Sequence, residues 1–282
     1  MKVIFIAGLG RSGSNLLDLL LDSHIQVYGL GEIRRLPRIY ENPHKSCSCG
    51  DSLWDCKFWS RVNEVMKEKF GREISSLNLD SKETATFHQD NRIFFDSVAG
   101  VCDTCYVTDN SKRPRRLRQL LAAPDIDVYP VHVLRDPRGY VHSQSKRKQQ
   151  YIGPALSYTF RSINLFQLLR NREHVVVEYE QLARDPEKLL RQLMHRLGLE
   201  FEPELLNWAE HVHHNVGSAK SVLRKTKGSS IRADNAWYNT IPKYRQVVIN
   251  FLSWPGRILN RIKKRRWGLD IGQDTGTGNS HG

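Results

Sequence analysis

The sequence predicts an α/β fold with three layers, in which a central, mostly parallel sheet carries helices on both faces. Three observations lead to this prediction. Strand-like and helix-like segments alternate along the 282 residues. The 39% hydrophobic residues, with 19 glycines, are enough to build a globular core. A glycine-rich turn joins the first strand to the first helix, and such turns lie at the ligand-binding edge of α/β sheets.

The first elements are short. Lys2–Ala7 (KVIFIA) is predicted to be a buried strand, and Ser12–Ser23 a helix whose leucines cover more than one face. Gln26–Gly29 is predicted as the second strand, and a helix-like stretch follows near Arg34–Glu41. The segment Cys47–Trp59 is rich in loop-forming residues, and we interpret it as an insertion between sheet elements.

The remaining elements continue the alternation. Three further strands are expected, over Cys105–Asp109, Asp127–Leu134 and His174–Glu178. Three helices are expected beside them, over Gly139–Gln149, Pro154–Arg170 and Pro186–Leu197. The last of these helices has its proline at the start and Gly198 after its end, the positions at which helices favour these residues.

The carboxyl-terminal part differs in composition from the rest. We expect a main domain over residues 1–240, a basic amphipathic helix over 241–271 and a disordered tail over 272–282. Asn235–Leu269 holds eight Lys or Arg and no acidic residue, with large apolar side chains between the cations. This pattern favours a helix packed on the domain; contact with an anionic membrane surface or with nucleic acid is the alternative.

The charge balance limits the partners of the chain. It has 43 Lys or Arg against 30 Asp or Glu, a net charge of +13, which suggests a polyanionic partner. No apolar run approaches the roughly 18 residues that a spanning helix needs. The five cysteines, an odd number, favour reduced thiols, so we expect a cytoplasmic location.

The segment Gly8–Asn15 (GLGRSGSN) is the strongest local signal. Gly8 and Gly13 have the spacing of the nucleotide-binding P-loop, GxxxxGK[ST], and successive backbone N–H groups there can surround an anion. Ser14 stands where that motif has its Lys, while Arg11 supplies a cation within the loop. The fold is therefore predicted to be of the P-loop nucleotide-binding type, with a loop that holds a phosphate-like group without a metal position.

A second anion site is predicted at HVLRDPRGYVHSQ. Arg135 follows the end of a strand, and Ser143 lies about two turns into the next helix. A guanidinium can hold a phosphate by two parallel hydrogen bonds. An ordinary strand-to-helix boundary with surface arginines would have a similar sequence. Together with the first loop, however, this segment indicates a nucleotide that carries phosphates at both ends.

These two segments resemble the P-loop sulfotransferases, which move a sulfuryl group from 3′-phosphoadenosine 5′-phosphosulfate (PAPS) to an acceptor. In that family a G-x-P-R-S-G-[ST]-[ST]-L loop grips the 5′-phosphosulfate, and R-[DN]-P-R-[DG]-x-[VA]-x-S contacts the 3′-phosphate. This chain has Gly10 in place of the Pro and Asn15 in place of the second hydroxyl residue. The resemblance implies a nucleotide-binding set of Gly10, Arg11, Ser12, Gly13, Ser14, Asn15, Arg135 and Ser143.

The resemblance extends to the expected chemistry. Glu32, in LGEIRRLPRI, matches the G-E-[ET]-x-x-[IL]-P-R-[IVL] motif of tyrosylprotein sulfotransferases, in which the Glu is the base. The alternative is an ion pair between Glu32 and Arg34 or Arg35. Lys112, in YVTDNSKRPRRL, matches D-x-S-K-x-P-x-R-L, whose Lys stabilises charge on the bridging oxygen. The implied catalytic set is Glu32, Arg11 and Lys112.

Two rival functions remain open from the sequence. A P-loop kinase would use Asp109 as a magnesium carboxylate, but it needs the Lys that this loop lacks. A basic membrane- or nucleic-acid-binding module would use the carboxyl-terminal cations. Other cations are expected to be solvated: Arg115, Arg116 and Arg118. Phosphate contacts could also come from a later basic loop, among Lys220, Arg224, Lys225 and Lys227.

The cysteines and histidines do not predict a metal. The cysteines form two groups, Cys47, Cys49 and Cys56 in one loop and Cys102 and Cys105 elsewhere. A zinc site could draw on both groups, but the CxC spacing is poorer than paired CxxC, so we expect no metal ligands. A surface helix end is the favoured interpretation for His211, His213 and His214.

The expected activity is thus sulfuryl transfer of the bacterial type, from PAPS to an acceptor hydroxyl or amine. The resemblance implies that adenosine 3′,5′-bisphosphate is the product and that no metal is required. The expected partners are the nucleotide and an acceptor of unknown class, with peripheral contact of the basic helix with an anionic membrane and no nucleic acid.

Overall fold

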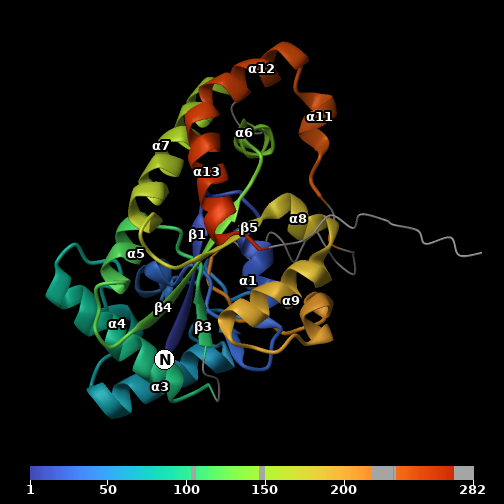
Figure 1. Ribbon diagram of the computed structural model, residues 1–282. Coiled ribbons are helices and arrows are strands. Elements are labelled where there is room, and N and C mark those ends of the chain that lie inside the picture. The colour runs from blue at the N-terminus through green and yellow to red at the C-terminus, as the bar shows by residue number, and fades with distance from the viewer. Residues whose placement is uncertain (103–105, 146–149, 218–230, 232, 270–282) are drawn as a thin grey trace, which may run out of the picture.

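A five-stranded parallel sheet forms the centre of the molecule (Figure 1). The computed structural model describes residues 1–102, 106–145, 150–217, 231 and 233–269. The strands lie in the order β2-β3-β1-β4-β5, and every neighbouring pair is parallel. Their bounds are β1 Lys2–Gly8, β2 Val27–Gly29, β3 Tyr106–Asp109, β4 Asp127–Leu134 and β5 Val175–Glu178. Each described strand lies within a residue or two of its predicted range, which confirms the predicted sheet.

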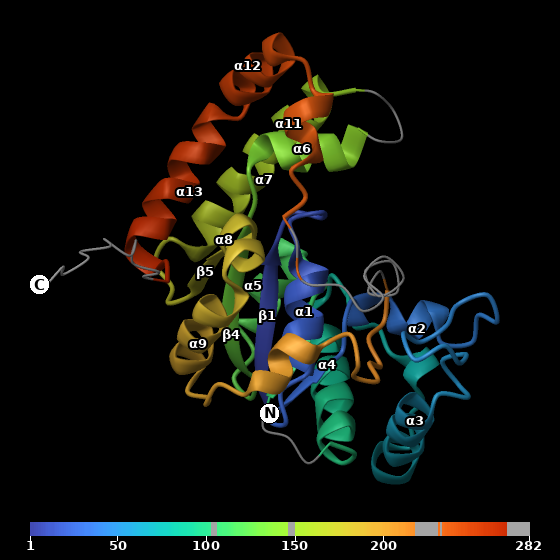
Figure 2. The same cartoon turned by 90° about the vertical axis from the view of Figure 1, so that its right-hand side faces the viewer.

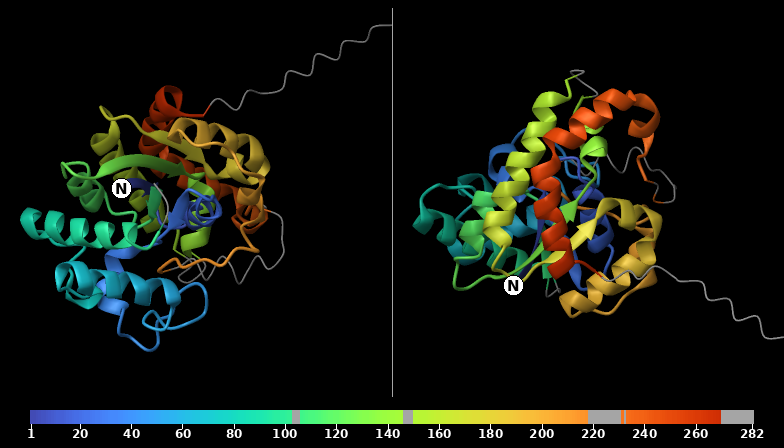
Figure 3. Two further views of the ribbon diagram at one scale, coloured as in Figure 1. Left: turned by 90° about the horizontal axis from the view of Figure 1, so that it is seen from below. Right: turned by 45° about the horizontal axis from the view of Figure 1, so that its top comes forward.

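Helices cover both faces of the sheet because β1 is apolar on both sides. Val3, Phe5 and Ala7 pack into one core and Ile4 and Ile6 into the other, as the alternation of side chains along a strand requires. The first core is closed by α3 (Lys57–Phe70), α4 (Thr84–Ala99), α5 (Pro114–Leu120) and part of α7 (Ile152–Leu169). The second is closed by α1 (Ser14–Asp22), α8 (Tyr179–Arg184) and α9 (Pro186–Leu197). Figure 3 shows α3 and α4 on the opposite side of the sheet from α9, which confirms the three-layer prediction.

Some helices differ from the predicted ranges. The stretch near Arg34–Glu41 forms two short pieces, the 3-10 turn η1 (Ile33–Arg35) and α2 (Leu36–Ile39), with a proline in the first turn of α2. Helix α6 (Pro137–Ser145) begins at its proline, two residues before the predicted start. Helices α3 and α4 were not predicted, although Phe58, Trp59, Val62 and Met66 have helical spacing and are buried.

The basic carboxyl-terminal segment forms two helices where a single helix was expected. Helix α12 (Lys243–Leu252) ends before Ser253, and α13 (Trp254–Trp267) begins with Pro255 in its first turn, because a proline ring cannot continue the preceding helix. Both helices contact α7, and α13 also contacts β5 (Figure 1). The division of the chain at residue 240 stays a prediction, and Cys105 and residues 272–282 lie outside the described residues.

None of the helices in the described part of the chain combines the length and the apolar character needed to cross a bilayer.

Candidate active site

The predicted site residues meet at the carboxyl edge of the sheet, beside β1. This strand lies between β3 and β4. The chain continues from β1 to β2 and β3 on one side and later crosses to β4 and β5 on the other side. Open α/β sheets bind their ligands at such a change of direction. The loop Gly8–Asn15 follows β1, Lys112 follows β3 and Arg135 follows β4. Figure 2, where N marks the start of β1, shows the other end of the strand pointing toward α6 and α11 (Ala236–Thr240).

The loop Gly8–Asn15 leads its backbone into the start of α1. Gly13 caps the helix in the left-handed conformation (φ 92°), and its carbonyl accepts from the N–H groups of Leu16 and Leu17. A Cβ at Gly13 would collide with the ring of Tyr179, so only glycine fits there. Gly13 therefore opens α1 at this loop, so the positive end of the helix lies where an anion would bind.

Two predicted catalytic cations have unusual backbones. Arg11 has φ 75° and Lys112 φ 60°, in the left-handed region that side chains other than glycine rarely adopt. Among the described residues other than glycine, these two alone have positive φ. Strain of this kind persists where the surrounding structure holds the residue in place, and it is concentrated at functional sites.

Arg135 joins the two predicted anion sites. Its Nη1 donates to the carbonyl oxygen of Arg11 over 2.7 Å, and its guanidinium stacks 4.6 Å from the ring centroid of Tyr179. Its Nη2 lies 3.2 Å from a carboxylate oxygen of Asp234. Among the described residues, neither the buried Arg135 Nε nor the buried Ser12 Oγ has a hydrogen-bond partner. These two buried polar atoms without a partner could both donate hydrogen bonds to a phosphate group bound at this edge of the sheet.

The start of α6 supports Arg135. Arg138 forms an ion pair with Asp136 (2.8 Å), and a Cβ at Gly139 would lie 3.1 Å from Arg135 Nε. Ser143 lies two residues before the end of α6 and is half-buried.

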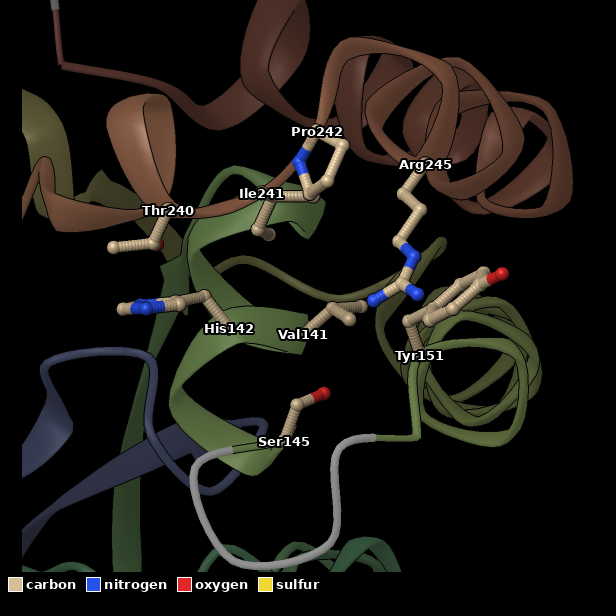
Figure 4. Close-up of a pocket in the computed structure, with 8 residues that line it drawn as sticks. All are labelled: Val141, His142, Ser145, Tyr151, Thr240, Ile241, Pro242 and Arg245. Carbon is tan, nitrogen blue, oxygen red and sulfur yellow. The ribbon is translucent and has the colours of Figure 1, made fainter.

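A pocket of about 230 Å³ lies between α6 and residues 240–245 (Figure 4). It is lined by Val141, His142, Ser145, Tyr151, Thr240, Ile241, Pro242 and Arg245. These residues belong to α6, to α11 and to the segments that begin α7 and α12, and none belongs to the Gly8–Asn15 loop. The pocket is therefore next to the candidate site and does not contain it.

Glu32 lies across the loop from Arg135. It follows Gly31, which takes φ 74°, and its N–H donates to the carbonyl oxygen of Val216 over 2.8 Å. Glu32 is 9% exposed, and its carboxylate lies between two cations, with Lys112 Nζ at 3.5 Å and Arg35 Nε at 3.3 Å. The alternative of an ion pair with Arg35 is thus present in the structure, together with the contact to the predicted catalytic Lys112.

Asn15, the departure from the family loop, holds Lys112 in the site. Its Oδ1 accepts from Lys112 Nζ and from Asn110 Nδ2, each over 2.9 Å. Burial lowers the pKa of Lys112, and the charge of Glu32 opposes that shift. The structure thus brings the loop, Glu32 and Lys112 together as predicted, and it gives Asn15 a partner that the sequence did not indicate.

Asp109 counts against the rival kinase interpretation, and Arg116 corrects an expectation. Asp109 is fully buried and accepts from Arg116 Nε over 2.6 Å and from Ser111 N over 2.9 Å. This ion pair uses the carboxylate that a magnesium site would need. Arg116, expected to be solvated, is also fully buried, because Asn91 of α4 accepts from its Nη2 over 2.8 Å. The partner helix was not predicted, and so neither was the burial.

The segment 211–217 also differs from its prediction as a surface helix end. His213 is buried, with Nδ1 2.5 Å from Asp22 Oδ2, and Asn215 Nδ2 donates to Asp18 Oδ2 over 3.2 Å. Val216 extends the sheet edge by a parallel bridge to Gly31. The segment therefore binds α1 and the backbone beside Glu32. The later basic loop with Lys220, Arg224, Lys225 and Lys227 lies outside the described residues.

Asp18 is a buried carboxyl on α1 behind the loop. It accepts from Thr108 Oγ1 and from the amides of Asn110 and Asn215. Burial raises the pKa of Asp18 to about 7; the Thr108 hydrogen bond opposes this shift, and the Asp22 charge adds to it. The folded chain therefore keeps a proton that the unfolded chain releases near pH 4.

Replacing Asp18 with Asn is expected to remove one pH dependence of stability. Because the pKa of Asp18 is higher in the folded chain than in the unfolded chain, this carboxyl stabilises the fold at pH values below the unfolded pKa of about 4. That contribution to the unfolding free energy is lost as the pH rises from about 4 to about 7, by up to about 1.4 kcal/mol per pH unit. The measurement is urea unfolding across this range. The unfolding free energy of the wild type, minus that of Asp18→Asn, should fall as the pH rises. Asp96→Asn, at a surface ion pair, is the control, and a constant difference would contradict the shift.

Comparison with known proteins points to one family of enzymes. A model described as the sulfotransferase family matches residues 3–203. Carbohydrate sulfotransferase 5 of Mus musculus is 26% identical over 46% of this chain and 41% of its own length. Protein-tyrosine sulfotransferase 1 of Danio rerio is 27% identical over 86% of this chain and 67% of its own length. The chain thus spans less than half of the first relative.

Solved structures agree on the fold. The sulfotransferase domain of the Synechococcus PCC 7002 olefin synthase has a TM-score of 0.58 at 19% identity, covering 90% of this chain and 94% of that domain. The sulfotransferase domain from the curacin biosynthetic pathway has a TM-score of 0.50, also at 19% identity, covering 89% of this chain and 97% of that domain.

Proposed function

Because this chain belongs to the sulfotransferase family, we propose that it moves a sulfuryl group from PAPS to an acceptor hydroxyl or amine. One observation carries the proposal. Arg135 Nη1 bonds the carbonyl oxygen of Arg11 over 2.7 Å, so the two predicted anion sites adjoin at one sheet edge. A nucleotide with phosphates on both sides of its ribose fits two adjacent cationic sites.

The nucleotide-binding role of each residue follows from where it lies at the carboxyl edge of the sheet. Residues 10–15 and the start of α1 hold the 5′-phosphosulfate through backbone N–H groups and the Ser12 hydroxyl. Arg135 and Ser143 hold the 3′-phosphate, Arg135 through the fork of its guanidinium. PAPS supplies the activated sulfuryl group; these residues bind it and orient it.

The transfer needs a base and positive charge. Glu32 takes the proton from the acceptor oxygen or nitrogen, and its place beside Lys112 (3.5 Å) sets the base next to the leaving-group cations. Lys112 and Arg11 stabilise the negative charge that develops on the leaving phosphate oxygen. The strained backbones of Lys112 and Arg11 hold both residues in place, so neither cation has to reorganise during the reaction.

A direct test separates this function from a kinase. The full chain is titrated calorimetrically with adenosine 3′,5′-bisphosphate in magnesium-free buffer, and labelled PAPS is offered with carbohydrates, tyrosine peptides, small alcohols and amines. Binding of the bisphosphate and label transfer to one acceptor class are expected without added magnesium. Binding of ATP only with magnesium, and none of the bisphosphate, would overturn the proposal.

We also propose that the enzyme is cytoplasmic and contacts anionic membranes through one surface. Six exposed apolar side chains lie on its helices: Ile152, Leu156 and Phe160 of α7, with Val247, Phe251 and Trp254 of α12 and α13. The two helices α7 and α12 are in contact at one end of the molecule (Figure 1). Arg261, Arg265 and Arg266 of α13 are exposed cations, and a basic helix that also carries apolar side chains complements anionic lipid. Free thiols at the four described cysteines support the cytoplasmic location.

Vesicle binding tests the membrane contact. The chain is expected to sediment with phosphatidylserine vesicles and much less with phosphatidylcholine vesicles. Phe251 and Trp254 are 79% and 60% exposed, and replacing both with Ser should weaken binding at least about tenfold, because each loses roughly 1.5–3 kcal/mol of apolar burial. Ile25→Ser, at an equally exposed residue elsewhere, is the control. Equal binding to both lipids would contradict the proposal.

A further inference from the structure

We propose that the chain binds a structural zinc ion through a cysteine cluster made of Cys47, Cys49, Cys56 and His214. The four potential ligand atoms lie within 4.8 Å of one another. His214 Nδ1 is 3.1 Å from Cys56 Sγ and 3.6 Å from Cys47 Sγ. Three thiols and one imidazole nitrogen therefore surround a common point, although His214 is more than 150 residues from the cysteines.

These distances match a tetrahedral ion. Zinc–sulfur and zinc–nitrogen bonds of about 2.3 and 2.0 Å place tetrahedral donor atoms about 3.5–3.8 Å apart. The two sulfur–nitrogen distances already lie near these values. No pair of donor atoms in the cluster has to close by more than about 1 Å, which small side-chain rotations can provide.

The backbone prepares the cysteines for a shared ligand. Cys47 N donates to Asp51 O over 2.9 Å and Gly50 N to Cys47 O over 3.2 Å, which folds the chain tightly around Cys49. Gly50 has φ 120°, a conformation that glycine alone adopts readily. A bridge between Ser46 and Ser52 closes this turn. Cys56 directly precedes α3, whose amino-terminal end favours a thiolate.

His214 is oriented independently of any ion. Trp59 Nε1 donates to its carbonyl oxygen over 2.9 Å. Its ring lies nearly parallel to that of Tyr28, at 7° and 6.4 Å between centroids, and 5.7 Å from the ring of Phe58. These contacts keep the imidazole pointed at the cysteines, a fixed orientation of the kind that second-shell contacts give to metal ligands.

The donor set selects the metal and its role. Thiolates with an imidazole suit zinc, and four protein ligands leave no open position for substrate, so the site is structural and takes no part in the transfer. The sequence favoured no metal because CxC is a poor spacing and His214 is distant in the chain. Of the described cysteines, Cys102 lies outside the cluster.

The ion would link the cysteine cluster to the candidate active site. It would connect the loop of residues 46–56 to the segment 211–217. In that segment Val216, two residues after His214, accepts a hydrogen bond at its carbonyl oxygen from the N–H of Glu32. Metal loss should therefore loosen the position of Glu32. This consequence rests on the proposed function, whereas the metal site does not.

Metal content of the full chain tests the site. The protein is purified without chelator, and its zinc content is measured by elemental mass spectrometry. About one zinc per chain is expected in the wild type and in Cys102→Ser, the matched control thiol. Loss of about one equivalent is expected in Cys49→Ser and His214→Ala.

A second measurement covers variants that do not fold. Wild-type protein exchanged into cobalt should show the visible bands of a tetrahedral ion and the near-ultraviolet bands of thiolate-to-cobalt charge transfer. Wild type without zinc or thiolate bands, iron in place of zinc, or a disulfide among the three cysteines would each overturn the site. A failure of PAPS transfer with one zinc bound would contradict the proposed function and leave the metal site standing.

Discussion

Glu32→Gln is expected to slow sulfuryl transfer about 10²–10⁴-fold, the usual contribution of a general base. Glutamine keeps the size of the side chain and can still accept from Lys112, but it cannot take a proton. The affinity for adenosine 3′,5′-bisphosphate should not change, because the proposed role of Glu32 is to take the proton of the acceptor and not to hold the nucleotide. The measurements are turnover at saturating PAPS and calorimetry of the nucleotide.

The control for this variant is Glu41→Gln, an exposed carboxylate nine residues along the chain. It should transfer at the wild-type rate. Unchanged turnover in Glu32→Gln, with the fold intact, would remove Glu32 from the role of base. Equal loss of turnover and nucleotide affinity would instead indicate a structural role.

Arg135→Ala is expected to weaken adenosine 3′,5′-bisphosphate binding about 10- to 150-fold, since one charged hydrogen bond contributes about 1.5–3 kcal/mol. Arg135→Lys should recover only part of this loss, because an ammonium lacks the guanidinium fork. Calorimetry measures the affinity. Urea unfolding is measured in parallel, because Arg135 also bonds the Arg11 carbonyl oxygen.

A second nucleotide locates the lost contact. Adenosine 5′-monophosphate lacks the 3′-phosphate, so its affinity should fall much less in Arg135→Ala than that of the bisphosphate. Arg161→Ala, at an exposed position of α7, should change neither affinity. Equal losses for both nucleotides would mean that Arg135 acts through the loop and does not contact the 3′-phosphate.

The sheet and the two anion sites could be predicted because their signals are local. An apolar run such as KVIFIA defines a strand by itself, and the carboxyl ends of parallel strands must share one edge. Arg11, Arg135 and Lys112 each follow a strand end, so their proximity was already implied by the order of elements.

The parts that could not be predicted depend on distant partners. Arg116 looked like one cation in a solvated run, and its burial needs Asn91 from a helix that was not predicted. His213 and His214 looked like surface residues because Asp22 and Cys56 are distant in the chain. Asn15 looked like a lost hydroxyl, and Lys112 supplies its role only in the folded chain.

The hydrogen bond from Glu32 to Val216 has a consequence for synthesis of the protein. The nucleotide loop and the proposed base are translated before the carbonyl group that positions the base, which emerges from the ribosome 184 residues after Glu32. A nascent or prematurely terminated polypeptide lacking Val216 has the proposed base without the anchor that places it. Stalled translation products of this gene are thus expected to be inactive as enzymes.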